Sequence, residues 1–417
     1  MKMYRIFIIV YLFVPFLFFA KKHVVHNGES ITSYIKISNC GDTIIVDKGI
    51  YYEYDINVDK SLFIIGISTP TIEVNKKGSG FVLISNDIVI ENFQIQNIAF
   101  SYTKEYAAFF LNSVKECTIK NNIILNSFFG IYLSKSDKCE IISNKIIGFA
   151  KKESNSGNAI HLWQCRCCKI LNNTIEKHRD GIYLEFVKAS IIHKNISKNN
   201  IRYGMHFMFS DSCEYAFNEF SYNTAGVAVM YSKNIKMYRN VFNKNWSYIS
   251  NGILLKDIKE SIIEYNDFKD NTIGIYMEGC INNQFRYNNV IKNGKAIKIY
   301  GNCDNNYFEK NNFIDNFFEV VSNSSINNNT FVNNFWTNYS GYDLNKDSIG
   351  DIPHHPVNLS TYILEISPNA VILLLSPLLD LLNLIEKVNP EFTPAYLIDE
   401  KPLMYPNKII YDKYPKS

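Results

Sequence analysis

The sequence predicts an all-β protein, a right-handed parallel β-helix with coils of about 22 residues, followed by a C-terminal loop and a short helical tail. Three observations predict this fold. An asparagine and a small residue each recur with that period, and strand-forming Ile, Tyr and Phe dominate the segments between them. The chain of 417 residues is also long for one ordinary globular domain, whereas a solenoid needs no central core.

The asparagine column follows a β-branched or aromatic segment in each repeat. It comprises Asn122, Asn144, Asn173, Asn195, Asn218, Asn240, Asn266, Asn288, Asn311 and Asn329. Most successive gaps are 22 or 23 residues, and the last is 18. Because asparagine hydrogen-bonds the turn backbone and tolerates left-handed geometry, we expect each one at a corner of the coil.

The second column consists of small residues, each followed by an alternating segment. Its members are Gly130, Ala159, Gly181, Gly204, Gly226, Gly252, Gly274 and Ala296. Alternation points the first and third residues after the small residue inward and the second and fourth outward. The inward residues are apolar in all of these coils, which favours one continuous core.

Nine cysteines are an odd number, and their spacing follows the repeat rather than a disulfide framework. Cys117, Cys139, Cys168 and Cys213 each lie five residues before a corner asparagine, so we interpret them as inward-facing core residues. Cys280 and Cys303 fall on adjacent coils, where they could stack as thiols or form a bridge.

Residues 1–20 have the features of a secretory signal peptide. Lys2 and Arg5 precede an apolar stretch over residues 6–19 that Pro15 interrupts, too short to span a bilayer. The protein is therefore expected to be exported, and a retained membrane anchor is the alternative.

Residues 24–333 are expected to form the β-helix, with a less regular start that caps its first end.

Residues 334–417 are expected to form a C-terminal cap that carries a candidate metal loop and a partner-docking tail. Asp343, Asn345, Asp347 and Asp351 repeat the alternating oxygen ligands of calcium loops, although a hydrogen-bonded turn explains them equally. Residues 376–387 predict a helix of about 18 Å, too short to cross a membrane. Its apolar residues pack on the coil end or dock a partner; they are Leu378, Leu381, Leu382 and Ile385.

The charge balance argues against a polyanionic partner. The formal net charge is +3, and no block of Lys and Arg appears in the body of the chain. We therefore expect no nucleic acid among the partners.

The outward columns predict a soft-metal site on a shared, solvent-facing strip. Met208 and Met230 should stack on adjacent coils, with His206 two residues away on the same face and His161 two coils below. Thioether and imidazole ligands suit Cu(I) and disfavour hard cations, and so few ligands would suit transient binding. The alternative is a Met-rich and aromatic patch that docks a protein partner.

Three ordered blocks resemble the NosD family. They are residues 202–210 (RYGMHFMFS), residues 226–232 (GVAVMYS) with residues 252–257 (GILLKD), and a C-terminal set over residues 336–356, 374–377 and 399–404. Three residues depart from the family pattern: Ser348 replaces the usual Gly, and His354 and His355 occupy a place that is often aromatic.

The resemblance implies a periplasmic accessory protein rather than an enzyme. In that family the protein works with a membrane permease and a cytoplasmic ATPase in an ABC-type complex at the inner membrane. It takes copper from a lipoprotein chaperone during assembly of the copper centre of nitrous oxide reductase. The same resemblance therefore implies apo nitrous oxide reductase as the final recipient.

Two other classes are considered because β-helices serve many functions. A polysaccharide lyase or epimerase needs paired carboxylates with a basic residue along an outward groove. Here Glu185 and Glu278 lie in one outward column but are separated by Met208, Met230 and Lys256. A purely structural surface β-helix would not require the specific C-terminal tail.

Overall fold

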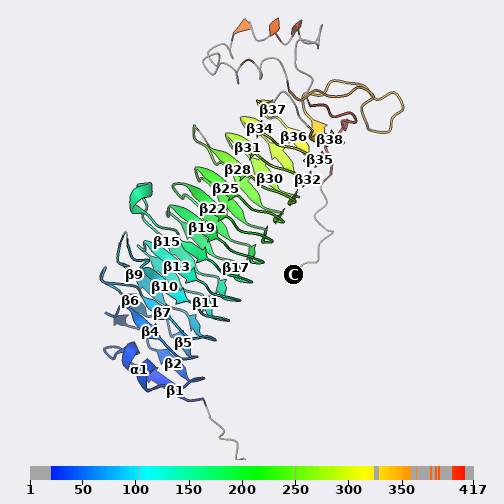
Figure 1. The fold of residues 1–417 in the computed structure, drawn as a ribbon. Coiled ribbons are helices and arrows are strands. Elements are labelled where there is room, and N and C mark those ends of the chain that lie inside the picture. Colours follow the sequence, from blue (N-terminus) through cyan, green and yellow to red (C-terminus); the bar gives the residue numbers. More distant parts are fainter. Residues whose placement is uncertain are drawn as a thin grey trace, which may run out of the picture.

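The computed structural model describes residues 20–101, 103–248, 250–323, 328–357, 363, 376–377, 381–382, 384–385 and 397–408. They form a right-handed parallel β-helix, an elongated stack of coils that ends in the C-terminal loop (Figure 1). Each complete coil adds one strand to each of three parallel sheets, here named A, B and C. The predicted fold class is confirmed.

The strands are short, and corresponding strands of successive coils are neighbours in the same sheet. Sheet A contains β1 (Lys22–Val25), β2 (Thr43–Val46), β5 (Phe63–Gly66), β8 (Val89–Glu91), β11 (Thr118–Lys120), β14 (Glu140–Ile142), β17 (Lys169–Leu171), β20 (Ile191–His193), β23 (Glu214–Ala216), β26 (Lys236–Tyr238), β29 (Ile262–Glu264), β32 (Gln284–Arg286), β35 (Tyr307–Glu309) and β38 (Thr330–Val332). Sheet B contains β3 (Ile50–Tyr51), β6 (Thr71–Glu73), β9 (Gln94–Gln96), β12 (Ile123–Leu125), β15 (Lys145–Ile147), β18 (Thr174–Glu176), β21 (Ile196–Lys198), β24 (Glu219–Ser221), β27 (Val241–Asn243), β30 (Asp267–Lys269), β33 (Asn289–Ile291), β36 (Asn312–Ile314) and β39 (Phe335–Trp336). Sheet C contains β4 (Ile56–Val58), β7 (Phe81–Leu83), β10 (Ala107–Asn112), β13 (Phe129–Ser134), β16 (Ile160–Trp163), β19 (Asp180–Glu185), β22 (Tyr203–Met208), β25 (Ala225–Met230), β28 (Asn251–Lys256), β31 (Ile273–Glu278), β34 (Lys295–Tyr300) and β37 (Phe318–Ser322).

The core runs the length of the coil, and sheet C alternates as the sequence predicts. The first and third residues after each small residue are buried, as with Ile131 and Leu133 in β13. The small residue itself is required by close packing between rungs. A Cβ atom added at Gly204 would lie 2.6 Å from the carbonyl oxygen of Gly226, which leaves no room for a larger side chain.

The cysteines predicted to face inward do so. Cys117, Cys139, Cys168 and Cys213 are buried among apolar side chains, and burial raises the pKa of the Cys213 thiol to about 12. The predicted stacking of Cys280 and Cys303 is also observed, since the Cys280 N–H donates to the Cys303 Sγ at 3.4 Å. Both residues are free thiols in this structure.

A ladder of buried asparagines joins the rungs at the corner between sheets A and B. From Asn144 on, each Oδ1 accepts from the backbone N–H and the side-chain Nδ2 of the asparagine one rung earlier, at 3.0 and 3.1 Å for Asn144 with Asn122. The members are Asn122, Asn144, Asn173, Asn195, Asn218, Asn240, Asn266, Asn288, Asn311 and Asn334.

The assignment of Asn329 to this column was therefore wrong. Asn329 ends a different ladder, at the corner between sheets C and A, where it accepts from the backbone N–H of Asn306. A further ladder lies at the corner between sheets B and C and comprises Asn200, Asn223, Asn245, Asn271, Asn293 and Asn316. At all three corners, therefore, asparagine side chains form hydrogen bonds between successive rungs.

The left-handed residue at the first corner is the one before the ladder asparagine, not the asparagine itself as expected. Asn121, Phe217 and Tyr265 have φ values of 58°, 57° and 57°. A bulky side chain in this region carries strain. Outward stacking offsets part of it, as in the Tyr265 and Tyr287 rings, whose centroids are 5.0 Å apart.

Both ends of the coil are covered. At the first end, helix α1 (Ile31–Ile37) buries Ile31 and Ile35 against the core, and a short 3₁₀ helix, η1 (Glu153–Asn155), interrupts the coils later. At the last end, Asp399 takes the next place in the first asparagine ladder. Its Oδ2 accepts from the Asn334 N–H, the Asn334 Nδ2 and the Trp336 Nε1, each at 3.0 Å.

Candidate metal-binding face and corner groove

The outward face of sheet C carries the four residues expected to bind copper. Strand pairing aligns one column of Tyr132, His161, Tyr183, His206 and Ala228. It aligns a second column of Ser134, Trp163, Glu185, Met208, Met230 and Lys256. Met208 therefore lies opposite Met230 on the next rung, so the predicted coil-to-coil register is confirmed.

This face is less open than the sequence suggested. His206 is only 4% exposed, and Met208 and Met230 are half-buried. The His206 ring lies between Tyr183 and Tyr203, with both ring centroids 4.9 Å away. The expected solvent-facing strip is therefore wrong for His206, because aromatic side chains of its own and the preceding rung cover the ring.

A buried carboxylate lies beside this histidine. Asp180, at the start of β19, is 0% exposed. Its Oδ1 is 3.2 Å from the Nε of Arg202 and accepts from the Tyr203 N–H, while its Oδ2 is 3.6 Å from the Nε of Arg179. Two guanidinium groups therefore compensate one buried negative charge. The Asp180 Oδ2 also lies 3.8 Å from the His206 Nδ1 and accepts no hydrogen bond.

The Arg202 side chain determines which His206 nitrogen carries the proton. Its Nη2 lies 3.1 Å from the His206 Nδ1. A guanidinium group only donates, so Nδ1 must accept and the ring proton must be on Nε2. Nε2 is buried and makes no hydrogen bond among the described residues.

His161 occupies a similar enclosed position two rungs away. Its ring lies 4.5 Å from Tyr132 and 4.7 Å from Tyr183, and its Nδ1 is 3.3 Å from the Nδ2 of Asn158. Burial, assisted by the Arg179 charge, lowers the pKa of His161 to about 3. The imidazole is therefore neutral near pH 7, which is the form that binds metals.

The Met208 thioether is engaged by a tyrosine of the preceding rung. The Tyr183 hydroxyl donates to the Met208 Sδ at 3.6 Å, and burial raises the pKa of Tyr183 to about 12, so the hydroxyl stays protonated. Met205 faces inward and is fully buried, as predicted. Further along the column Lys256 and Glu278 form an ion pair at 2.9 Å.

This donor set fits a soft metal ion better than a hard one. In the part of the chain that the structure describes, no three His, Cys, Asp or Glu side chains gather as a metal site. Two thioethers on adjacent rungs beside an imidazole instead provide ligands that Cu(I) prefers. The alternation did not identify Tyr183, Arg202 and Asp180 as partners of this set. For Asp180 and Arg202 the signal was a charged residue one or two positions before the small residue, at Gly181 and Gly204.

The candidate calcium loop uses its oxygens within its own turn. Asp343 accepts from the N–H groups of Asp347 and Ser348, and Asp351 accepts from that of Leu344. Asn345 and Asp347 likewise accept from the backbone of the loop. Ser348, in the place where the family usually has Gly, adopts a φ of 70°. These contacts favour the turn alternative, and calcium binding stays a prediction.

The predicted docking residues are only partly within the described chain. Leu381, Leu382 and Ile385 are helical, with Leu381 51% and Ile385 37% exposed, whereas Leu378 lies outside the described residues. The expected signal peptide over residues 1–20 also lies outside them, except for Ala20. Within the described ranges, no helix has the length and hydropathy that a membrane-spanning segment requires.

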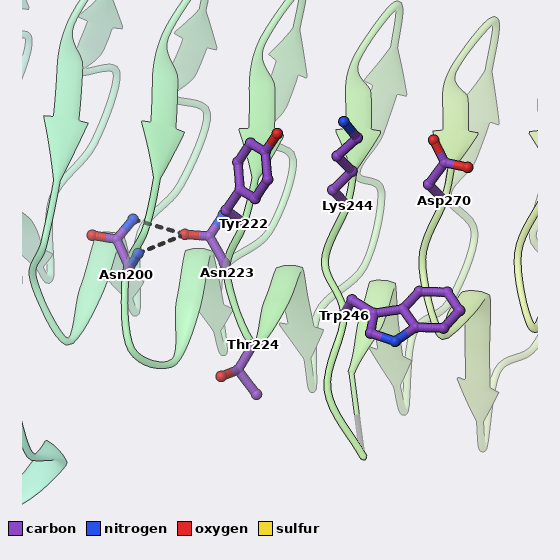
Figure 2. A pocket seen from close by; sticks show the side chains of 7 residues that line it. All are labelled: Asn200, Tyr222, Asn223, Thr224, Lys244, Trp246 and Asp270. Atoms are coloured by element: carbon purple, nitrogen blue, oxygen red, sulfur yellow. Dashed lines mark hydrogen bonds between the residues drawn. The ribbon is translucent and has the colours of Figure 1, made fainter.

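A second candidate site is a groove at the corner between sheets B and C. Figure 2 shows Tyr222, Lys244 and Asp270 on successive rungs, with the Trp246 indole below Lys244 and Asp270. Trp246 is 64% exposed and lines both this hollow of about 490 Å³ and another of about 580 Å³. The second hollow is lined by Lys292, Gly294, Asp315, Phe317 and other residues.

Comparison with known proteins gives the following matches. A family model described as periplasmic copper-binding protein (NosD) matches residues 147–347. A probable ABC transporter binding protein NosD of Stutzerimonas stutzeri is 25% identical over 353 residues, which cover 80% of each chain. The protein of the same name from Pseudomonas aeruginosa is 23% identical over 406 residues, covering 85% of this chain and 86% of the relative.

Among solved structures, the periplasmic alginate epimerase AlgG has 16% identity and a TM-score of 0.46, with 79% of this chain and 75% of that chain covered. A GH136 lacto-N-biosidase from Eubacterium ramulus has 11% identity and a TM-score of 0.47, with 74% and 68% covered. The family model spans the rungs that carry His161, His206, Met208 and Met230, and the two relatives extend the match to at least four-fifths of the chain. Over residues 147–347 the chain is similar to the NosD family model, and over at least four-fifths of its length it is similar to the two NosD proteins.

Proposed function

We propose that this protein is a periplasmic accessory protein for assembly of the copper centre of nitrous oxide reductase. It binds or relays copper as part of an ABC-transporter-type complex, and it transfers the metal rather than catalysing a reaction. The observation that carries the proposal is the stacking of Met208 on Met230, with His206 on the same outward face. The family description and the names of the relatives support the metal and the transporter association.

The oxidation state follows from the donor chemistry. Thioether sulfur binds Cu(I) and has little affinity for the hard divalent ions of the same compartment. Met208, Met230 and His206 would be the nearest ligands, and His161 would act as a second imidazole two rungs away. Few ligands, of which Met208, His206 and His161 are already engaged by or enclosed among protein groups, suit a site that must release its ion to a recipient.

The partners in this proposal are the permease, the ATPase, a lipoprotein copper chaperone and apo nitrous oxide reductase. The chaperone would dock over sheet C, where the half-buried methionines are accessible. Leu381, Leu382 and Ile385, together with Leu378, would contact the membrane partner through their apolar side chains. This places the metal face and the transporter contact on different parts of the chain.

A copper titration tests the proposal. The exported form would be titrated anaerobically with Cu(I) in competition with a chromophoric chelator. The Met208→Leu/Met230→Leu double variant keeps the apolar volume but removes both sulfur atoms. We expect its affinity to fall at least tenfold, because the thioethers supply the soft ligands.

Leu254→Ala provides the matched control. Leu254 pairs with Ala228, is half-buried on the same outward face and carries no sulfur. This variant should bind Cu(I) as the unaltered protein does. Equal affinity in the double methionine variant and the unaltered protein would exclude the assigned site.

The corner groove favours a second candidate function, carbohydrate binding. An exposed indole can stack on the apolar face of a sugar ring, and Lys244 and Asp270 could hydrogen-bond its hydroxyl groups. Two hollows that share Trp246 in their linings would suit a linear oligosaccharide. Asp270 is the acidic side chain lining the first hollow, which suits binding better than the paired-carboxylate chemistry of a lyase.

Tryptophan fluorescence tests this second candidate. Titration with neutral oligosaccharides should change the emission of the unaltered protein and leave that of Trp246→Ala unchanged. The Met208→Leu/Met230→Leu variant, altered on a different face, should respond as the unaltered protein does. A fluorescence response that persists in Trp246→Ala would exclude the groove.

A further inference from the structure

The contacts around His206 hold both ring nitrogens away from a metal. Nδ1 has the lone pair, but it accepts from Arg202 at 3.1 Å. Nε2 carries the proton and is buried without a hydrogen-bond partner among the described residues. A metal ion needs an unprotonated nitrogen, so the imidazole cannot bind copper in this arrangement.

We propose that Arg202 is a latch that keeps His206 closed to copper, and that Asp180 is the carboxylate that orients the ring when the latch opens. This inference rests on the proposed copper function and adds its regulation. Arg202 and Asp180 act through His206 and are positioning residues.

The open arrangement needs only a local change. When Arg202 withdraws, the proton on Nε2 leaves to water and another proton from water binds Nδ1, so the number of protons on the ring does not change. The new Nδ1–H donates to the Asp180 Oδ2, which lies 3.8 Å away and accepts no hydrogen bond in the closed arrangement. Nε2 then presents a lone pair, and a carboxylate that orients a metal-binding histidine is a common arrangement.

Arg202 has the freedom that such a latch requires. Its side chain is 27% exposed, and its guanidinium lies over the Tyr203 ring at 4.6 Å, so it can move outward along the aromatic surface. Asp180 would keep a cation when Arg202 leaves, because Arg179 stands 3.6 Å from its Oδ2. An incoming copper ion repels the Arg202 charge, which couples metal arrival to opening.

Arg202→Met tests the latch, and Arg179→Met is its matched control. Both variants remove one guanidinium from Asp180, but only Arg202 contacts His206. We expect Arg202→Met to bind Cu(I) about tenfold to a hundredfold more tightly, because no charge-assisted bond must break first. Arg179→Met should not tighten Cu(I) binding, because the contact between Arg202 and His206 is kept. Asp180→Asn should weaken binding about tenfold or more, since the orienting carboxylate is lost.

A second measurement reports the latch without copper. Nitrogen-15 spectra of protein labelled at histidine distinguish the two tautomers. His206 should carry its proton on Nε2 in the unaltered protein and on Nδ1 in Arg202→Met. Should Arg202→Met not fold, Arg202→Lys keeps the charge beside Asp180 but loses the fork that bridges it to His206, and the same shift is expected.

The outcomes separate this inference from the proposed function. An Nε2–H signal that persists in the Arg202 variants, or a Cu(I) affinity equal to that of Arg179→Met, overturns the latch even when the methionine double variant loses copper. Unchanged copper binding in the methionine double variant overturns the proposed site, whatever the tautomer spectra show.

Discussion

Replacing Asp399 by alanine should destabilise the C-terminal rungs of the coil. Asp399 is fully buried and its Oδ2 accepts from three donors, the Asn334 N–H, the Asn334 Nδ2 and the Trp336 Nε1, each at 3.0 Å. Alanine leaves all three without an acceptor. A buried donor without a partner costs about 1–3 kcal/mol, so the loss is about 3–6 kcal/mol when partial entry of water is allowed for.

Asparagine at the same position should be tolerated. From Asn144 to Asn334 each asparagine Oδ1 of this ladder accepts the same pair of donors, as Asn334 does from Asn311. Asp399→Asn keeps that acceptor and loses mainly the bond from the Lys401 N–H to Oδ1, at 3.2 Å. Its expected destabilisation is about 1 kcal/mol.

Hydrogen exchange is the appropriate assay because the rungs of a solenoid open locally rather than all together. About 3 kcal/mol corresponds to roughly a hundredfold loss of protection. Amides of β38 and β39 should show this loss in Asp399→Ala, while those of β8 and β11, at the other end, should not change. Equal protection of β38 and β39 in the alanine and asparagine variants would refute the role of Asp399 as the end of the ladder.

Three further predictions concern pH, the ladder and the metal face. Burial lowers the pKa of His161 to about 3 and of His178 to about 4, so below pH ~6.5 the unfolded chain binds protons that the folded chain does not. Denaturant titrations should therefore show the free energy of unfolding falling by about 2 kcal/mol per histidine between pH 6.5 and 5, and a flat profile would contradict this. Asn240→Ala removes both an acceptor and a donor from the middle of the asparagine ladder between sheets A and B, and should reduce stability to thermal unfolding by about 2–4 kcal/mol. A change below about 0.5 kcal/mol would mean that water replaces the amide. Tyr183→Phe removes the donor to the Met208 Sδ and should tighten Cu(I) binding a few-fold in the chelator assay, with little change in melting temperature. Weaker Cu(I) binding would contradict this and would mean that the hydroxyl helps to hold Met208 for the metal.

The sequence was sufficient to predict the fold and the rung register because both follow from period and alternation. The asparagine ladder at the corner between sheets B and C was missed, although its signal was present. Asn200, Asn223 and Asn245 each lie five residues after a member of the ladder between sheets A and B. The misplacement of Asn329 had a similar cause. A gap of 18 residues fits no coil, whereas Asn334 restores a gap of 23.

Other features could not be predicted because they depend on contacts between distant segments. Asp399 reaches the ladder from 65 residues beyond Asn334, and no periodicity points to it. The enclosure of His206 depends on how Tyr183 and Tyr203 fold over it, which alternation alone does not give. The pairing of Arg202 with both Asp180 and His206 likewise depends on side-chain geometry across two rungs.

The most direct test of the copper assignment is anomalous diffraction at the copper edge from crystals grown with Cu(I) under anaerobic conditions. A peak beside the Sδ atoms of Met208 and Met230, over β22 and β25, is the predicted result, and it should vanish in the Met208→Leu/Met230→Leu variant. A peak at the exposed thiols of Cys40 or Cys167, or no peak over sheet C, would contradict the account.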